Sequence, residues 1–190
     1  MYTYGISNAQ VLITFEFIIN YLRSAKEIAV AVQNLIYIYK QQKTEFILQT
    51  TLSEHQDHVT GLSWSKNNRI VSCSSDRNAY VWTLENGNQW KPTLVLLRIP
   101  KGARCVQWNE NETKFVVGSV GICAVCWFDE ENDWWVSKHI KVKGTVLSID
   151  WHTTGILFAC GSTDGKAVHL LNTSLFTHSK EGFIWVCQGY

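Results

Sequence analysis

The 190-residue chain lacks the features of a linker, a membrane span or a highly charged arm. It has only two prolines and no low-complexity tract, so no flexible linker can be identified. The formal net charge is +1, which favours neither nucleic acid nor an anionic membrane as a partner. The most hydrophobic window, 11–19, contains Glu16 and is far shorter than the roughly 20 apolar residues of a membrane helix, so we expect a buried strand there. No basic segment precedes it, which argues against a signal peptide.

Clusters of cysteine are also missing. Scattered cysteines in apolar runs behave as small buried side chains, and we expect reduced thiols in a cytosolic protein. Cys123 and Cys126 have the spacing of a zinc or redox pair. Strand positions three apart face opposite ways, however, and no second pair completes four ligands, so a packing role is favoured. The six cysteines are Cys73, Cys105, Cys123, Cys126, Cys160 and Cys187.

Aromatic residues, in contrast, are abundant at 13%, with nine tryptophans, which suits strands and sheet packing. Trp64, Trp108 and Trp151 lie 44 and 43 residues apart. Each ends a short apolar stretch with a branched aliphatic residue two positions earlier, so the two side chains share one face of a strand. A repeat of this length in a β-rich chain predicts propeller blades, each with four strands.

The same period places the other strands of each blade. Second strands are expected from Ile70, Phe115 and Leu157. Third strands are expected at 80–84, 124–128 and 167–171, and outer strands at 91–97 and 134–140. A weaker copy of the pattern precedes these, with strands at 28–32 and 35–39.

This register divides the chain into blades and two flanking segments. Residues 1–25 are either a diverged first strand or not native to the fold, and 175–190 are the start of a further blade or a frayed tail. The blades between them cover 26–174, as a partial blade at 26–51 followed by 52–93, 94–138 and 139–174.

Four residues of the best-formed repeat have the spacing of the hydrogen-bonded set that ties a WD-repeat blade together: His55, Ser72, Asp76 and Trp82. His55 and His58 could instead form a metal pair or an acid–base couple, but the spacing favours a structural His55 and a solvated His58. The WD dipeptide is absent, so the prediction depends on periodicity. The predicted fold class is an all-β, incomplete WD-repeat β-propeller of about four four-stranded blades.

Four stretches are more specific than a generic WD repeat: 76–84, 90–99, 131–141 and 146–152. They closely resemble subunit 1 of the actin-related protein 2/3 complex, a WD-repeat propeller family, with strong likeness over 52–171. The resemblance implies a non-enzymatic scaffold of the cytoplasm and actin cytoskeleton, without cofactors, that supports branched actin nucleation. Its implied partners are the other subunits, the actin filament and the acidic tails of nucleation-promoting factors. A degenerate WD-repeat adaptor with other protein partners is the alternative.

The chain also departs from that family. Family propellers have seven blades, or about 300 residues at this repeat length, so we expect a shortened form with an open arc of blades. The family's long loop insert, implicated in filament contact, is missing, and the segment before 145–151 is shorter by about two residues. An open arc exposes apolar blade faces, and we expect a chain that aggregates or needs partners to fold.

One charged feature is a candidate partner-docking patch: Arg98, Lys101 and Arg104 around Gly102. Such a patch would attract acidic segments, although loop solubility is the ordinary explanation for basic residues. Three more lysines follow one repeat later, at Lys138, Lys141 and Lys143. The acids Asp129, Glu130, Glu131 and Asp133 match a solvated turn better than a catalytic pair or a calcium loop. No nucleophile or phosphate-loop motif is present, so we expect no catalytic, cofactor or metal residues.

Overall fold

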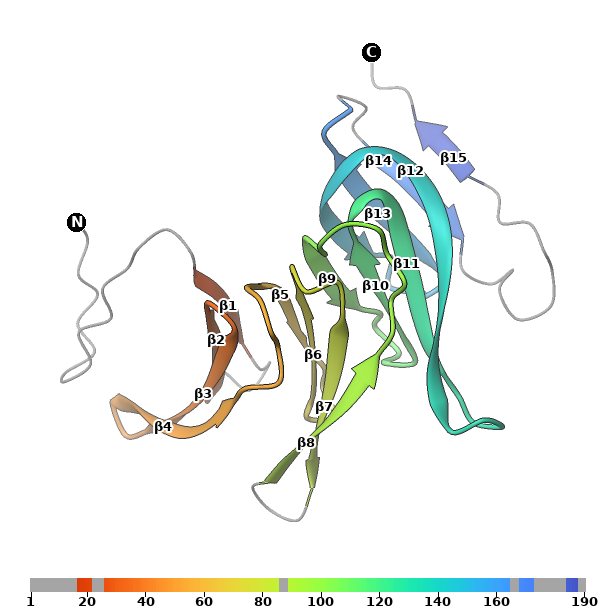
Figure 1. Cartoon of the computed structure of the whole chain (residues 1–190). Helices are drawn as coiled ribbons and strands as arrows, with labels where there is room; N and C mark the ends of the chain where they lie inside the picture. The colour runs from red at the N-terminus through yellow and green to blue at the C-terminus, as the bar shows by residue number, and fades with distance from the viewer. Residues whose placement is uncertain (1–16, 22–25, 86–88, 165–167, 173–183, 188–190) are drawn as a thin grey trace.

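The computed structural model describes residues 17–21, 26–85, 89–164, 168–172 and 184–187, and side chains in 26–85 and 89–164 (Figure 1). All regular structure in these segments is β-strand, arranged as antiparallel blades that lie side by side. Within each blade the strands follow chain order. No helix in this described part is long and apolar enough to cross a membrane.

The strands divide among four blades. Blade one contains β1 (Phe17–Tyr21), β2 (Glu27–Val32), β3 (Leu35–Gln42) and β4 (Glu45–Leu52). Blade two contains β5 (Val59–Trp64), β6 (Arg69–Ser74), β7 (Ala79–Glu85) and β8 (Gln89–Val95). Blade three contains β9 (Cys105–Trp108), β10 (Lys114–Gly118), β11 (Val120–Asp129) and the first part of β12 (Trp134–Trp151). Blade four contains the rest of β12, with β13 (Leu157–Ser162), β14 (Val168–Asn172) and β15 (Ile184–Cys187).

Blades three and four share β12, where the sequence predicted two separate strands. Residues 134–141 pair with β11, and Val146 onward pairs with β13, so seven strands form one continuous sheet (Figure 1). Gly144 lies just before this change of partner with φ +76°, a left-handed conformation that glycine adopts without strain. A Cβ there would lie 2.9 Å from the Asp164 nitrogen. Blades three and four are therefore linked by a short turn at Gly144 within β12, whereas longer connections precede the first strands of blades two and three, β5 and β9.

Both flanking segments contribute strands. β1 pairs with β2, so the first strand of blade one lies within 17–21; the remainder of the 11–19 window, before Phe17, lies outside the described residues. β15 pairs with β14 as the outer strand of blade four. The segment at 184–187 therefore forms a strand of blade four, within the range 175–190 for which the repeat pattern predicted the start of a further blade or a frayed tail.

Turn conformations repeat with the same period as the tryptophans. Positive φ recurs every 44 residues where the second strand leads into the third, at Gln33 and Arg77 in turns and at Gly121 in the second position of β11. The turns between first and second strands also contain residues with positive φ, spaced 44 and 43 residues apart: Asn68, Glu112 and Gly155. Only two of these six residues are glycine, so the repeated blade geometry imposes the left-handed conformation even on residues that adopt it at a cost.

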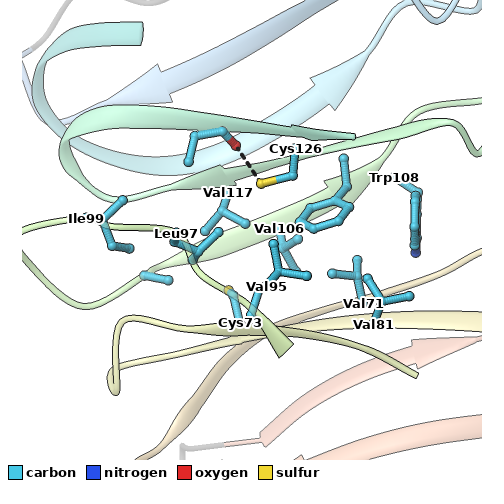
Figure 2. Close-up of a cluster of buried hydrophobic side chains, with 14 residues drawn as sticks. Val71, Cys73, Val81, Val95, Leu97, Ile99, Val106, Trp108, Val117 and Cys126 are labelled. Carbon is cyan, nitrogen blue, oxygen red and sulfur yellow. Dashed lines mark hydrogen bonds between the residues drawn. The ribbon is translucent and has the colours of Figure 1, made fainter. Parts of the chain in front are cut away.

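The hydrophobic core lies between blades. Strand alternation sends Phe115 and Val117 of blade three toward blade two, and Val116 toward blade four. The cluster between blades two and three joins Val81 and its neighbours to Val106 and other residues of blade three, as Figure 2 shows. Two further clusters fill the junctions of blades one and two and of blades three and four. Each of the two middle blades therefore buries both faces.

The tightness of one junction can be tested at Gly118, where a Cβ would lie 2.5 Å from Val146 Cγ1 and 2.7 Å from Cys105 Sγ. We expect Gly118→Ala to lower the free energy of unfolding by about 1–3 kcal/mol, because the two blades must separate to admit the methyl group. Urea denaturation followed by tryptophan fluorescence measures the change. The control, Val120→Ala on an exposed side chain, should stay within about 0.5 kcal/mol of the parent chain. Equal losses in both variants would contradict close packing at Gly118.

Candidate functional site: the loop rim

The site lies where the connections between blades meet the turns between second and third strands. We call this edge the loop rim; it contains the connections 53–58 and 96–104, the link 142–145 within β12, the turns 33–34 and 75–78, and residues 119–121 at the start of β11. Backbone hydrogen bonds join these segments across blade junctions, for example Ala103 N–H to the Ser74 carbonyl at 3.1 Å and Val59 N–H to the Gln33 carbonyl at 2.7 Å. The rim is thus a fixed surface.

A hydrogen-bonded network anchors the rim in blade two, and it brings together the four residues singled out by spacing. His55 Nδ1 lies 2.8 Å from Asp76 Oδ2, and His55 Nε2 lies 2.7 Å from Ser72 Oγ. The Trp82 indole N–H donates to the same Ser72 oxygen at 2.9 Å. One assignment satisfies all of these groups: Nδ1–H donates to the carboxylate, and the serine hydroxyl donates to Nε2.

The network holds a connection against a turn. His55 belongs to the connection 53–58, whereas Asp76 lies in the turn after β6, and Asp76 Oδ2 also accepts the Gln56 backbone N–H at 3.1 Å. Burial lowers the pKa of His55 below its usual value, although the hydrogen bond and the charge of Asp76 act in the opposite direction. The imidazole is therefore neutral at pH 7, which matches a structural role and disfavours a cationic one.

The candidate basic residues lie on the connection 96–104. Arg98, Lys101 and Arg104 are exposed there, while Leu97 and Ile99 on either side of Arg98 are buried. The backbone of the connection is held from both sides: Arg104 N–H donates to the Gly118 carbonyl of blade three at 2.8 Å, and Ala103 binds blade two as described above. The three side chains therefore project from a fixed backbone at the junction of blades two and three.

Arg77 joins this basic surface, although its position in the sequence gave no sign of it. The Arg77 and Ala103 backbone N–H groups both donate to the Ser74 carbonyl, at 3.2 and 3.1 Å, so the Arg77 turn lies beside the 101–104 segment. Arg77 itself is exposed. Its left-handed φ of 72° is the repeated turn conformation described above. A search for turns at the 44-residue period could have found it.

The lysines of the next repeat divide between two places. Lys141 and Lys143 are exposed on β12 close to the change of partner at the rim. Lys138 is half-buried and pairs with Val125 in the ladder between β11 and β12. Only Lys141 and Lys143 therefore extend the basic surface toward blade four.

The other candidate groups do not form a reactive site. Cys123 packs between blades three and four and Cys126 between blades two and three, so they cannot bind one metal ion together. Burial raises the pKa of the Cys105 thiol to about 12, which keeps it protonated. Asp129 stabilises the β11–β12 turn by accepting from the Glu131 N–H and the Asn132 amide. Among the residues that the structure describes, no three His, Cys, Asp or Glu side chains are placed to hold a metal ion.

The blade geometry agrees with comparisons to known proteins. Residues 46–83 and 135–168 match the family model "WD domain, G-beta repeat". Among solved structures, the β-propeller domain of Cps50 (Swd1) from Myceliophteria thermophila superposes with a TM-score of 0.66 at 14% identity, over 81% of this chain and 51% of that one. The chain is therefore a WD-repeat β-propeller protein, and the predicted fold class is confirmed.

The chain also has relatives of high sequence identity among WD-repeat proteins. Actin-related protein 2/3 complex subunit 1A-A of Xenopus laevis is 50% identical over 135 residues, which cover 69% of this chain and 36% of that protein. Subunit 1 of Schizosaccharomyces pombe is 47% identical over 138 residues, and that of Saccharomyces cerevisiae 46% over 142. The chain is homologous to this subunit 1 family, as its resemblance predicted. It spans a little over a third of the length of these relatives.

The pKa of His55 generates a prediction about stability. The unfolded chain has an ordinary histidine pKa of about 6.5, so below that pH it binds more protons than the folded chain. The free energy of unfolding should therefore fall as the pH is lowered from about 7.5 to about 5.5. Urea denaturation at a series of pH values measures the slope. His55→Gln should flatten it, whereas the exposed-site control His152→Gln should retain it, and a slope that survives His55→Gln would refute the assignment.

Proposed function

We propose that this chain is a non-enzymatic scaffold subunit of an actin-related protein 2/3 type complex in the cytoplasm and actin cytoskeleton. Identity of 45–50% to curated members of subunit 1 over about seven-tenths of the chain is the observation that carries the proposal. The scaffold would support nucleation of branched actin filaments through contacts with the other subunits and with the filament. The blades favour this role because their interlocked junctions present loops in fixed positions.

The loop rim supports a second part of the proposal, which is docking of the acidic tails of nucleation-promoting factors. Arg77, Arg98, Lys101 and Arg104 lie on neighbouring segments of the rim, and all four are exposed. Three acidic side chains lie on the same part of the rim, Glu54, Asp57 and Asp76, so the four cations outnumber them, and the Asp76 side chain is buried against His55. The surface between blades two and three therefore attracts anionic segments, and complementary charge accelerates their encounter.

Co-purification tests the scaffold role. We expect the tagged chain, expressed in cells whose own subunit 1 is depleted, to recover the actin-related proteins and the smaller subunits of the complex. A Val117→Asp variant places a charge in the core between blades two and three and should recover none of them, since Val117 is fully buried. Recovery of other proteins, with the subunits of the complex absent, would favour a WD-repeat adaptor with different partners.

Charge reversal tests the rim. Replacing Arg98, Lys101 and Arg104 with Glu should weaken binding of an acidic activator tail by about tenfold or more at low salt, and less as salt screens the interaction. Fluorescence anisotropy with a labelled tail peptide measures the affinity. The matched control reverses Lys40, Lys43 and Lys91, which are exposed and lie away from the rim. Unchanged affinity in the rim variant, or equal loss in the control, would exclude docking at this place.

A further inference from the structure

Three serines at equivalent positions hold the connections of the loop rim. Ser74, Ser119 and Ser162 lie at or just after the end of the second strand of blades two, three and four, 45 and 43 residues apart. Each hydroxyl donates to carbonyls of the connection that leads into its own blade. The acceptors are the carbonyl of Asp57 at 2.8 Å for Ser74, those of Lys101 and Gly102 at 3.0 and 2.9 Å for Ser119, and that of Lys143 at 2.7 Å for Ser162.

Ser119 differs from the other two because it holds the basic connection. Its side chain is completely buried, and two successive carbonyls of the connection converge on its one hydroxyl. On the opposite side the same segment lies against blade two, where the Thr60 hydroxyl donates to the Ala103 carbonyl at 2.9 Å. A Cβ on Gly102 would come within 2.9 Å of the Ser75 Cα, so no free space remains there. The segment 101–104 is thus clamped between two blades.

We propose that Ser119 is a positioning residue that orients Lys101 and Arg104 for an acidic partner; this rests on the proposed docking function of the rim. The two cations project from a backbone that is already ordered, so a bound acidic segment does not have to order the loop itself. Preorganisation of this kind raises affinity by lowering the entropic cost of association. The partner segment crosses the junction of blades two and three, since the backbone N–H groups of Arg77 on one side and of Ala103, next to Arg104, on the other both donate to the Ser74 carbonyl.

Removing the hydroxyl leaves the Lys101 and Gly102 carbonyls without this donor, so the backbone that carries Lys101 is held less firmly on the side of blade three. Ser119→Ala should raise the Kd for a labelled peptide of alternating Glu and Asp by about three- to tenfold at low salt, equivalent to one lost hydrogen bond. The matched control is Ser63→Ala, which removes a buried hydroxyl from the same junction; Ser63 accepts the Trp108 backbone N–H and does not touch the segment 101–104. Its Kd should stay within about twofold of the parent chain.

Two further measurements make the outcome decisive. Ser119→Thr keeps a hydroxyl and should recover most of the affinity. In the unmodified chain, hydrogen exchange should show protected amides at Ala103 and Arg104 without peptide, a result that does not depend on any variant folding. Rapid exchange there, or equal weakening by Ser119→Ala and Ser63→Ala, would overturn the role of Ser119.

The failures of the two proposals remain distinguishable. If the unmodified chain does not bind the acidic peptide, docking at the rim is wrong, and the role of Ser119 falls with it. If the unmodified chain binds, and reversal of Arg98, Lys101 and Arg104 abolishes binding while Ser119→Ala binds normally, docking stands and only the positioning role is wrong.

Discussion

Packing between blades is the constraint on which the rest of this structure depends. Residues of one strand alternate between two different cores, as Phe115 and Val116 do, so no blade contains a complete core of its own. Burial of apolar surface, the main stabilising contribution to folding, is therefore gained only when neighbouring blades are in place. The fixed spacing of the blades follows from this, and so does the fixed spacing of every loop that they carry.

Polar contacts convert this packing into a defined rim. The His55 network joins a connection to a turn within blade two. The Ser74 carbonyl accepts hydrogen bonds from Arg77 of the same blade and from Ala103 of the connection into blade three. These groups lie at the ends of strands, where backbone N–H and C=O groups no longer have ladder partners and must be satisfied in another way. The same contacts that satisfy the strand ends therefore also determine where the basic side chains lie.

Much of this structure could be predicted from the sequence, because a 44-residue period combined with strand alternation specifies both blades and core faces. The period located β5, β6 and β7 within one or two residues, and it singled out His55 and Trp82 as members of one network. It could not show that β12 is continuous, since a change of pairing partner leaves no mark on an extended segment. Arg77 was missed for a related reason: its place on the rim depends on a carbonyl shared with a connection 26 residues away.

The continuity of β12 has a mechanical consequence. Only residues 142–144 of β12 lie unpaired between its pairing with β11 and its pairing with β13, so the two ends of the strand rotate less freely than they would across a longer unpaired connection. A force applied at the exposed Trp134 on the outer edge of blade three is therefore transmitted along the backbone to Trp151, in the first strand of blade four. Blades three and four are therefore joined through a continuous strand, whereas connections without strand pairing join the other blades at 53–58 and 96–104.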